Sequence, residues 1–410
     1  MPQTRIFYGW YVVAAVLVIT TAASGFSFYA LPILLAAFTG EQGFSVSLAS
    51  AATATFFVAS GVGGMIAGRL AERIDVRLVV AGAATIGAMT LAMVGHITWL
   101  PQLFLFHFVF GLCHGSASLV PLMTVVARWF EARRSLAFSI GSTGLSLGGV
   151  VITPFVAHFV REAGLAAAAP WLGLGLFLGV VPAAVLILRP SPQSLGLEPD
   201  GGFKAEGQRK APPRPVVPFA QAVRSRIFYA VSAAYFLQLG AQVGGISHIY
   251  RLGSTRAGFE AAAMAVSAMA ACSTLGRLAG GWALMKVPSS AFAMSMMAGQ
   301  VAALMLLAVA DSTATIVASA VLFGLTMGNS LMMHPLLLAE RFGTRDYGRI
   351  YGLSQMMVVL GMAAGPALVG VLHDFAGGYR SAFLAIAGVT GLSLVVLAWG
   401  IREPGVADRA

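Results

Sequence analysis

Long apolar runs recur along the whole 410-residue chain, separated by short polar segments. Each run is long enough to cross the ~30 Å hydrocarbon core of a bilayer as a helix. The first run continues well past the length of a signal-peptide core, so we predict an uncleaved first span. The pattern predicts an all-α, multi-pass membrane protein with twelve spans, at residues 6–37, 45–67, 78–98, 101–127, 135–160, 165–188, 227–250, 259–284, 288–310, 312–338, 350–372 and 380–401.

One polar segment is much longer than the others and divides the spans six and six. It covers residues 189–226 and is rich in Pro, Gly and charged residues, which is typical of a linker. We therefore predict an N-terminal six-helix bundle over 1–188, a cytoplasmic linker over 189–226 and a C-terminal six-helix bundle over 227–410.

Short sequences recur in the two halves. The letters "RIFY" stand at Arg5 and again at Arg226, just before the first and seventh spans. The segment "GRLAERIDVR" (68–77) has a degraded counterpart in "GWALMKVPSS" (281–290). Parallel repeats of this kind are typical of transporters, with the substrate site near mid-membrane between the repeats.

The charge distribution bears on location and partners. The chain is 58% hydrophobic and 10% charged, with a formal net charge of +10. Basic residues gather between the spans, which indicates the positive-inside rule rather than nucleic-acid binding. With both termini in the cytoplasm, 20 of the 25 Lys and Arg residues lie inside and four outside. We expect a monomer in a bacterial cytoplasmic (inner) membrane, with lipids around it.

Arg277 is the one Asp, Glu, Lys or Arg that the sequence places well inside a span. It precedes Lys286 by nine residues, about 13 Å along a helix. A charge at that depth costs at least ~2.5–3.5 kcal/mol on insertion scales. One interpretation is that Arg277 snorkels to the headgroups or pairs with helix-end carbonyls. The other is that it faces a central cavity and holds an anion, because a guanidinium matches a carboxylate.

Four segments carry a family resemblance: "GRLAERIDVR", "FYGWYVVAA", "ARWFEARRSLAFSIGSTGLSLGG" and "SPQSLGLEPDG". The chain resembles the major facilitator superfamily and, within it, the bacterial monocarboxylate-transporter-like branch, which is similar to oxalate–formate antiporters. The resemblance implies two pseudo-symmetric six-helix bundles and transport by alternating access. The loop signature departs from the family at Asp75, where a second glycine is usual.

The resemblance also assigns a role to Arg277. In the family, the arginine four residues before the glycine matching Gly281 holds the substrate carboxylate. Proton-coupled relatives often pair it with an acid one turn earlier, which is Ser273 here, and the oxalate carrier has a second cation where Ser354 stands. A single cation in the site, with no second cation on span eleven, favours a monoanion over a dicarboxylate as the substrate. The missing acid leaves proton coupling open.

Other polar side chains in the spans are candidates for lining the same cavity. Three of them share a face of span eleven at i, i+3 and i+4. For each, the alternative is a hydrogen bond between helices. Besides Arg277, the predicted substrate-binding residues are Tyr29, Asn329, Tyr351, Ser354 and Gln355.

Two histidines are the candidate proton carriers. No Asp or Glu lies well inside a predicted span, since Glu260 stands at the start of 259–284, so His114 and His334 are taken as the groups that titrate there near neutral pH. The alternative is a structural histidine that donates to a backbone carbonyl.

A cluster of charged loop residues has two overlapping interpretations. One is membrane topology and solvation. The other, implied by the family resemblance, is a cytoplasmic gate of charge pairs that holds the outward-open state. The gate residues would be Glu72, Arg73, Asp75, Arg77, Arg128 and Arg133.

The sequence predicts a carrier and no enzyme. "GLSLG" (144–148) fits a hydrolase nucleophile pattern, but it lies mid-helix without a nearby acid. No spacing typical of a metal site or a phosphate loop is present, so we expect no cofactor and no metal. We predict a secondary active transporter of a small organic monoanion, a monocarboxylate, with protons as a candidate coupling partner. The alternative is efflux or uptake of a larger lipophilic compound, such as a drug or an iron-chelator complex.

Overall fold

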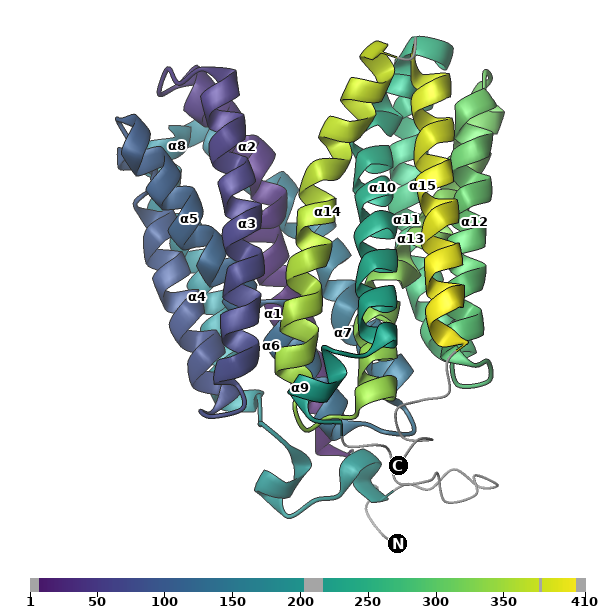
Figure 1. The fold of residues 1–410 in the computed structure, drawn as a ribbon. Helices are drawn as coiled ribbons and strands as arrows, with labels where there is room; N and C mark the ends of the chain where they lie inside the picture. The colour runs from purple at the N-terminus through teal and green to yellow at the C-terminus, as the bar shows by residue number, and fades with distance from the viewer. Residues whose placement is uncertain (1–6, 203–216, 376–377, 403–410) are drawn as a thin grey trace, which may run out of the picture. The chain divides into compact units, whose positions relative to one another are not determined.

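The structure is a computed structural model that describes residues 7–202, 217–375 and 378–402. The described residues form helices and no strand (Figure 1). Eleven helical stretches among them are long and apolar enough to cross a membrane. The prediction of an all-α, multi-pass membrane protein is confirmed.

The predicted fifth and sixth spans run together in one stretch of 54 residues, Arg134–Ile187. A straight α-helix of that length would measure about 80 Å, more than twice the bilayer core. The stretch is interrupted at Gly164, whose φ of 75° and ψ of 160° are not helical. The N–H of Leu165 donates to Glu41 Oε2 at 2.8 Å, so a carboxylate caps the helix that restarts there. The stretch therefore holds two crossings, which accounts for eleven stretches where twelve spans were predicted.

The chain divides into two compact units, one of Met1–Pro212 with Asp346–Met356 and one of Pro213–Arg345 with Met357–Ala410. The start of the predicted eleventh span thus groups with the first unit. The first unit contains α1 (Tyr8–Phe26), η1 (Phe28–Ala30), α2 (Leu31–Gly40), α3 (Val46–Leu70), α4 (Val76–Ala92), η2 (Val94–His96), α5 (Leu100–Ala117), α6 (Leu119–Trp129), α7 (Arg134–Leu147), η3 (Gly148–Ile152), α8 (Thr153–Pro182), η4 (Ala183–Ile187), η5 (Pro192–Leu195) and η6 (Pro199–Gly202).

The second unit begins with a four-residue helix and continues with long apolar helices. It contains α9 (Phe219–Ala222), α10 (Arg226–Ala257), α11 (Phe259–Ala283), α12 (Ser289–Val309), α13 (Thr313–Phe342), the later part of α14 (Tyr347–Phe375) and α15 (Tyr379–Ile401). Its apolar core lies between α10, α11, α12, α13 and α15, and Phe323 of α13 is completely buried in it.

Glycines allow α11 and α13 to pack backbone against backbone. A Cβ added at Gly276 of α11 would lie 2.7 Å from the carbonyl oxygen of Leu325. On α13, a Cβ at Gly328 would overlap the Ser273 carbonyl group, 2.9 Å from its carbon. Small residues are the means by which membrane helices approach closely, since burial of apolar surface does not drive association in lipid. In the first unit α3 and α5 meet in the same way, with Gly115 against Ser60.

We expect Gly328→Ala to destabilise the protein. The added methyl group overlaps backbone, which cannot rotate away, and overpacking of this kind costs about 1–3 kcal/mol. Thermal unfolding in detergent should show a lower Tm. Gly388→Ala on α15 is the matched control, because nothing lies within 4 Å of its added Cβ. Equal Tm values for the two variants would contradict the close α11–α13 contact.

The described part of the linker is anchored to the loop between α6 and α7. The carboxylate of Asp200 accepts hydrogen bonds from the N–H groups of Glu131 and Ala132 at 2.7 Å each, and of Arg133 at 3.3 Å. Asp200 is 9% exposed. These N–H groups belong to the turn between α6 and α7, so a linker residue supplies the acceptor for the backbone donors of that turn. This contact explains what the "LEPDG" segment does in the fold.

We expect Asp200→Ala to lower the Tm, because it leaves three part-buried N–H groups without their charged acceptor. Loss of hydrogen bonds to a charged group costs about 1.5–3 kcal/mol. Glu198→Gln is the matched control, since Glu198 is exposed and stands two residues away in the same segment. A Tm for Asp200→Ala no lower than that of the control would show that the anchor does not stabilise the fold.

Candidate functional site

Arg277 lies inside α11 and is 1% exposed. Its Nε donates to the carbonyl oxygen of Gly328 on α13 at 2.8 Å. Gly328 stands in the middle of α13, so the acceptor is not at a helix end. This burial and the bond to Gly328 favour a contact inside the helix bundle over the snorkelling interpretation. The guanidinium is instead held within the second unit against the backbone of a neighbouring helix.

Asn329 is the predicted binding residue that the structure brings to Arg277. It is 2% exposed, and its Nδ2 donates to the carbonyl oxygens of Gly276 and Leu325 at 3.0 Å each. The Gly276 bond crosses to the residue next to Arg277. Asn329 therefore makes a hydrogen bond between helices, which is the alternative that the sequence left open for it, and the sequence did not indicate its acceptor.

A separate polar network lies in the same unit. Gln238 of α10 donates through Nε2 to Gln300 Oε1 at 2.9 Å and to Ser330 Oγ at 3.1 Å, and it accepts from Ser393 Oγ at 3.2 Å. All four side chains are at most 2% exposed. The network ties α10, α12, α13 and α15 together. It indicates a rigid bundle interior rather than an open path.

His334 and His114 are placed in different units. His334 of α13 is 1% exposed, and its ring lies 5.0 Å from that of Tyr235. His114 of α5 packs on Phe56, with ring centroids 5.3 Å apart, and its Nδ1 has no hydrogen-bond partner among the described residues. Their predicted role as proton carriers stays a prediction.

The remaining binding candidates belong to the first unit. Tyr29 lies in η1, where α1 gives way to α2, and its ring faces Gly149 of the π-helical segment η3. Tyr351 is completely buried and stacks on Tyr347, with centroids 5.6 Å apart. Ser354 is also completely buried, and Gln355 is half-buried. Breaks and π-helical turns in a span are frequent at functional sites.

The predicted gate residues form two separate contacts. Asp75 caps α4 and pairs with Arg77 at 2.6 Å, a local contact that lowers the pKa of the Asp75 carboxyl group. Glu72 lies 3.8 Å from Arg349 Nε and accepts the Arg349 backbone N–H at 3.3 Å. Arg349 lies in the part of α14 that belongs to the first unit.

Of the other three predicted gate residues, Arg73 and Arg128 form no ion pair among the described residues. Arg73 is exposed, whereas Arg128 and Arg133 are half-buried. Arg133 instead donates its backbone N–H to Asp200, as described above. The predicted cluster therefore contributes Glu72 and Asp75 as its paired acids.

The sequence did not predict the contacts of two arginines near this loop cluster. Arg349 is the actual partner of Glu72, and it was counted only as a topological charge. Arg134 is 3% exposed and donates to the carbonyl oxygens of Phe130 and Ala127 at 2.8 Å and 2.9 Å, so it caps the end of α6. A buried arginine at a helix end has no signal in hydropathy, because its neighbours are charged as well.

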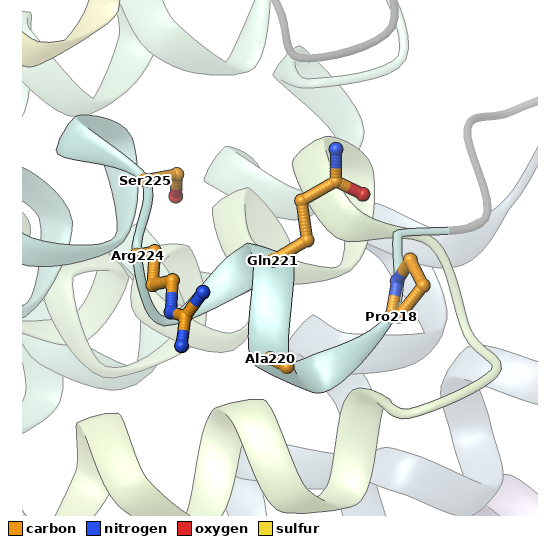
Figure 2. A pocket seen from close by; sticks show the side chains of 5 residues that line it. All are labelled: Pro218, Ala220, Gln221, Arg224 and Ser225. Carbon is orange, nitrogen blue, oxygen red and sulfur yellow. The ribbon is translucent and has the colours of Figure 1, made fainter.

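A surface pocket of about 480 Å³ lies at the junction of α9 and α10 (Figure 2). It is lined by Pro218, Ala220, Gln221, Arg224 and Ser225, none of which is a predicted binding residue. Figure 2 shows the side chains of Gln221 and Arg224 extending in different directions. No set of polar groups converges there, so the pocket is not a candidate substrate site.

The sequence matches the profile of the Major Facilitator Superfamily over residues 17–333 and again over 257–409. The chain belongs to the Major Facilitator Superfamily. The superfamily and its fold are those of membrane transporters, so the protein is a transporter and not an enzyme. The predicted fold class is confirmed with it.

Curated relatives in the superfamily span most of the chain. Monocarboxylate transporter 13 of Rattus norvegicus is 27% identical over 337 residues, covering 78% of this chain and 72% of that protein. The MFS transporter asaE of Aspergillus flavus is 25% identical over 358 residues, covering 81% and 76%. The predicted resemblance to the monocarboxylate-transporter-like branch is confirmed by these relatives.

Solved transporters of the superfamily share the fold. The transporter FucP, crystallised in the outward conformation, has a TM-score of 0.73 at 16% identity, covering 97% of this chain and 99% of that one. The human organic anion transporter MFSD10 (TETRAN) has a TM-score of 0.72 at 15% identity, covering 95% and 99%. Similarity at this identity supports the architecture alone.

The carboxyl group of Glu72 is expected to make the stability of the folded protein depend on pH. Burial raises the pKa of its carboxyl group above the usual 4.5, outweighing the lowering by Arg349 and Arg128. A raised folded-state pKa means that the folded protein holds the proton more tightly than the unfolded chain. The resulting stability is lost as pH rises from about 4.5 through the raised pKa.

Thermal unfolding between about pH 4 and 7 checks this sign. Glu72→Gln keeps an acceptor for the Arg349 N–H but cannot ionise. The Tm of the wild type should therefore fall relative to that of Glu72→Gln as pH rises. Glu162→Gln, at a side chain that is 59% exposed, is the control and should show no such trend. A Tm difference for Glu72→Gln that does not change with pH would count against the burial effect.

Proposed function

We propose that the protein is a secondary active transporter of a small organic monoanion, a monocarboxylate, that works by alternating access. Arg277 carries the proposal. A cation that is 1% exposed within an apolar span is costly, and carriers retain such residues on substrate pathways. Its Nε donates to the carbonyl oxygen of Gly328, which holds the guanidinium in place, and a planar guanidinium matches a carboxylate in a two-point contact.

The names of relatives support the class of substrate. Two of them, from Rattus norvegicus and Bos taurus, are named monocarboxylate transporter 13, at 27% and 28% identity. The proposal includes a monomer in a bacterial cytoplasmic membrane with both termini inside, and the distribution of Lys and Arg between the spans supports this orientation of the termini.

Coupling to protons is a further part of the proposal. No Asp or Glu lies one turn before Arg277, where Ser273 stands with its Oγ buried and without a hydrogen-bond partner among the described residues. The proton would therefore travel on His114, His334 or the substrate carboxyl group. A pH-independent uptake would point to exchange or uniport instead.

The substrate class is tested by a thermal-shift screen of the purified protein. Formate, acetate, pyruvate, L-lactate and benzoate are added in millimolar steps. A ligand that binds only the folded state raises stability with its concentration, by about 2.7 kcal/mol at 100 times Kd. A carrier of lipophilic compounds would ignore all five acids.

We expect Arg277→Ala to weaken anion binding by roughly 30- to 4,000-fold. Truncating one partner of a buried charge pair costs ~2–5 kcal/mol, at 1.4 kcal/mol per decade. Arg277→Lys should bind the anion more tightly than Arg277→Ala but more weakly than the wild type, because lysine keeps the positive charge and lacks the planar guanidinium.

Lys286→Ala is the matched control. Lys286 follows the end of α11 and lies over the Trp282 ring. The substitution Lys286→Ala should therefore leave the affinity for the anion unchanged. Equilibrium binding and monodispersity in detergent are measured together. Normal transport of an organic anion by well-folded Arg277→Ala would contradict the proposal. A carrier of a larger lipophilic compound would then become the better hypothesis.

A further inference from the structure

Arg277 and Asn329 bond each other's helices in a reciprocal way. Arg277 Nε donates to the carbonyl oxygen of Gly328, the residue just before Asn329. Asn329 Nδ2 donates to the carbonyl oxygen of Gly276, the residue just before Arg277. The two bonds, 2.8 Å and 3.0 Å long, cross the α11–α13 interface in opposite directions. We call these four residues the clasp.

The clasp depends on how closely the two helices approach. Gly276 and Gly328 lack a Cβ at two of the points where α11 and α13 touch. A larger residue at either position would push the helices apart and lengthen both bonds. The hydrogen bonds from Arg277 and Asn329 to the two glycine carbonyls therefore depend on the same distance between the helices.

The contacts of Asn329 do not suit a direct bond to an anion. Its amide nitrogen carries two hydrogens and donates to two backbone carbonyls. Its Oδ1 is buried, has no hydrogen-bond partner among the described residues, and lies against Gly280 of α11. An amide oxygen accepts hydrogen bonds and would repel a carboxylate.

We propose that Asn329 is a positioning residue for Arg277: it holds the α11 backbone at the distance where Arg277 Nε reaches Gly328, and so fixes the plane of the guanidinium. The inference rests on the proposed function, because the guanidinium is positioned for an anion. A carboxylate that binds Arg277 would then meet the guanidinium in one fixed orientation. A bidentate contact needs such a fixed plane, whereas a point charge does not.

A double-mutant cycle on the full chain tests the proposal. Asn329→Leu keeps the branched shape of the amide and removes its donors, and Arg277→Lys removes the guanidinium that is positioned. Acetate is the probe, because it offers little besides a carboxylate. Asn329→Leu should weaken acetate binding about tenfold in the wild type and change it little in Arg277→Lys, since coupled residues are not additive.

The same four proteins are unfolded by heat without ligand. If the clasp exists, the Tm loss of the double variant should be smaller than the sum of the Tm losses of the two single variants. Ser330→Ala is the matched control. Ser330 is the next buried polar residue on α13, but it bonds toward Gln238. Its effects should add to those of Arg277→Lys, with acetate affinity unchanged.

Three outcomes would overturn the positioning role. Equal losses of acetate affinity in both backgrounds would make Asn329 a direct contact. A lower Tm with unchanged affinity would make the clasp a packing device alone. Absence of binding by any of the five acids would refute the proposed function and the positioning role together, while the Tm cycle would still report whether the clasp exists.

Discussion

The close contact between α11 and α13 is the constraint on which the candidate site depends. Two helices can exchange side-chain to backbone hydrogen bonds only if their axes come near enough for a side chain to reach past the facing side chains. Gly276 and Gly328 remove the facing Cβ atoms at the two required points. The charge of Arg277 is then buried with a backbone acceptor at 2.8 Å, which offsets part of its cost in a lipid-surrounded bundle.

The same packing principle operates in the first unit with a different outcome. The helices α3 and α5 meet through Gly111 and Gly115, and there His114 of α5 packs on Phe56 of α3. The two units therefore share a packing scheme, which in the second unit holds the side chain of Arg277. The repeated sequence pattern gives both units the same close helix packing, and differences at individual positions determine which side chains lie at the contact.

Loop contacts follow a rule distinct from that of the bundle interiors. Near the ends of the helices, charged side chains bind unsatisfied N–H and C=O groups more than they bind each other. Asp200 caps the residues before α7, Glu41 caps the helix that restarts at Leu165, and Arg134 caps the end of α6. Helix ends leave four such groups each, and they need partners where the surroundings are partly dry. Charge pairs such as Glu72–Arg349 are added to this capping scheme.

The fold was predictable from sequence because its determinants are local. A bilayer imposes a fixed length and a hydropathy threshold on each span, so the number of crossings and the break between the fifth and sixth followed from composition alone. Arg277 was equally visible, since a single charge in an apolar run needs no partner to be noticed. Its acceptor Gly328, by contrast, is 51 residues away and depends on the register of two helices.

Only the tertiary structure decided which polar groups meet. Asn329 and Tyr351 had the same standing in the sequence, as polar residues within spans. The structure places the first against the α11 backbone and stacks the second on Tyr347 in the other unit. Asp200 was one acid in a polar linker until its three N–H donors were seen. Hydropathy acts over neighbours in the chain, whereas hydrogen bonds select partners by distance and direction, which the sequence does not contain.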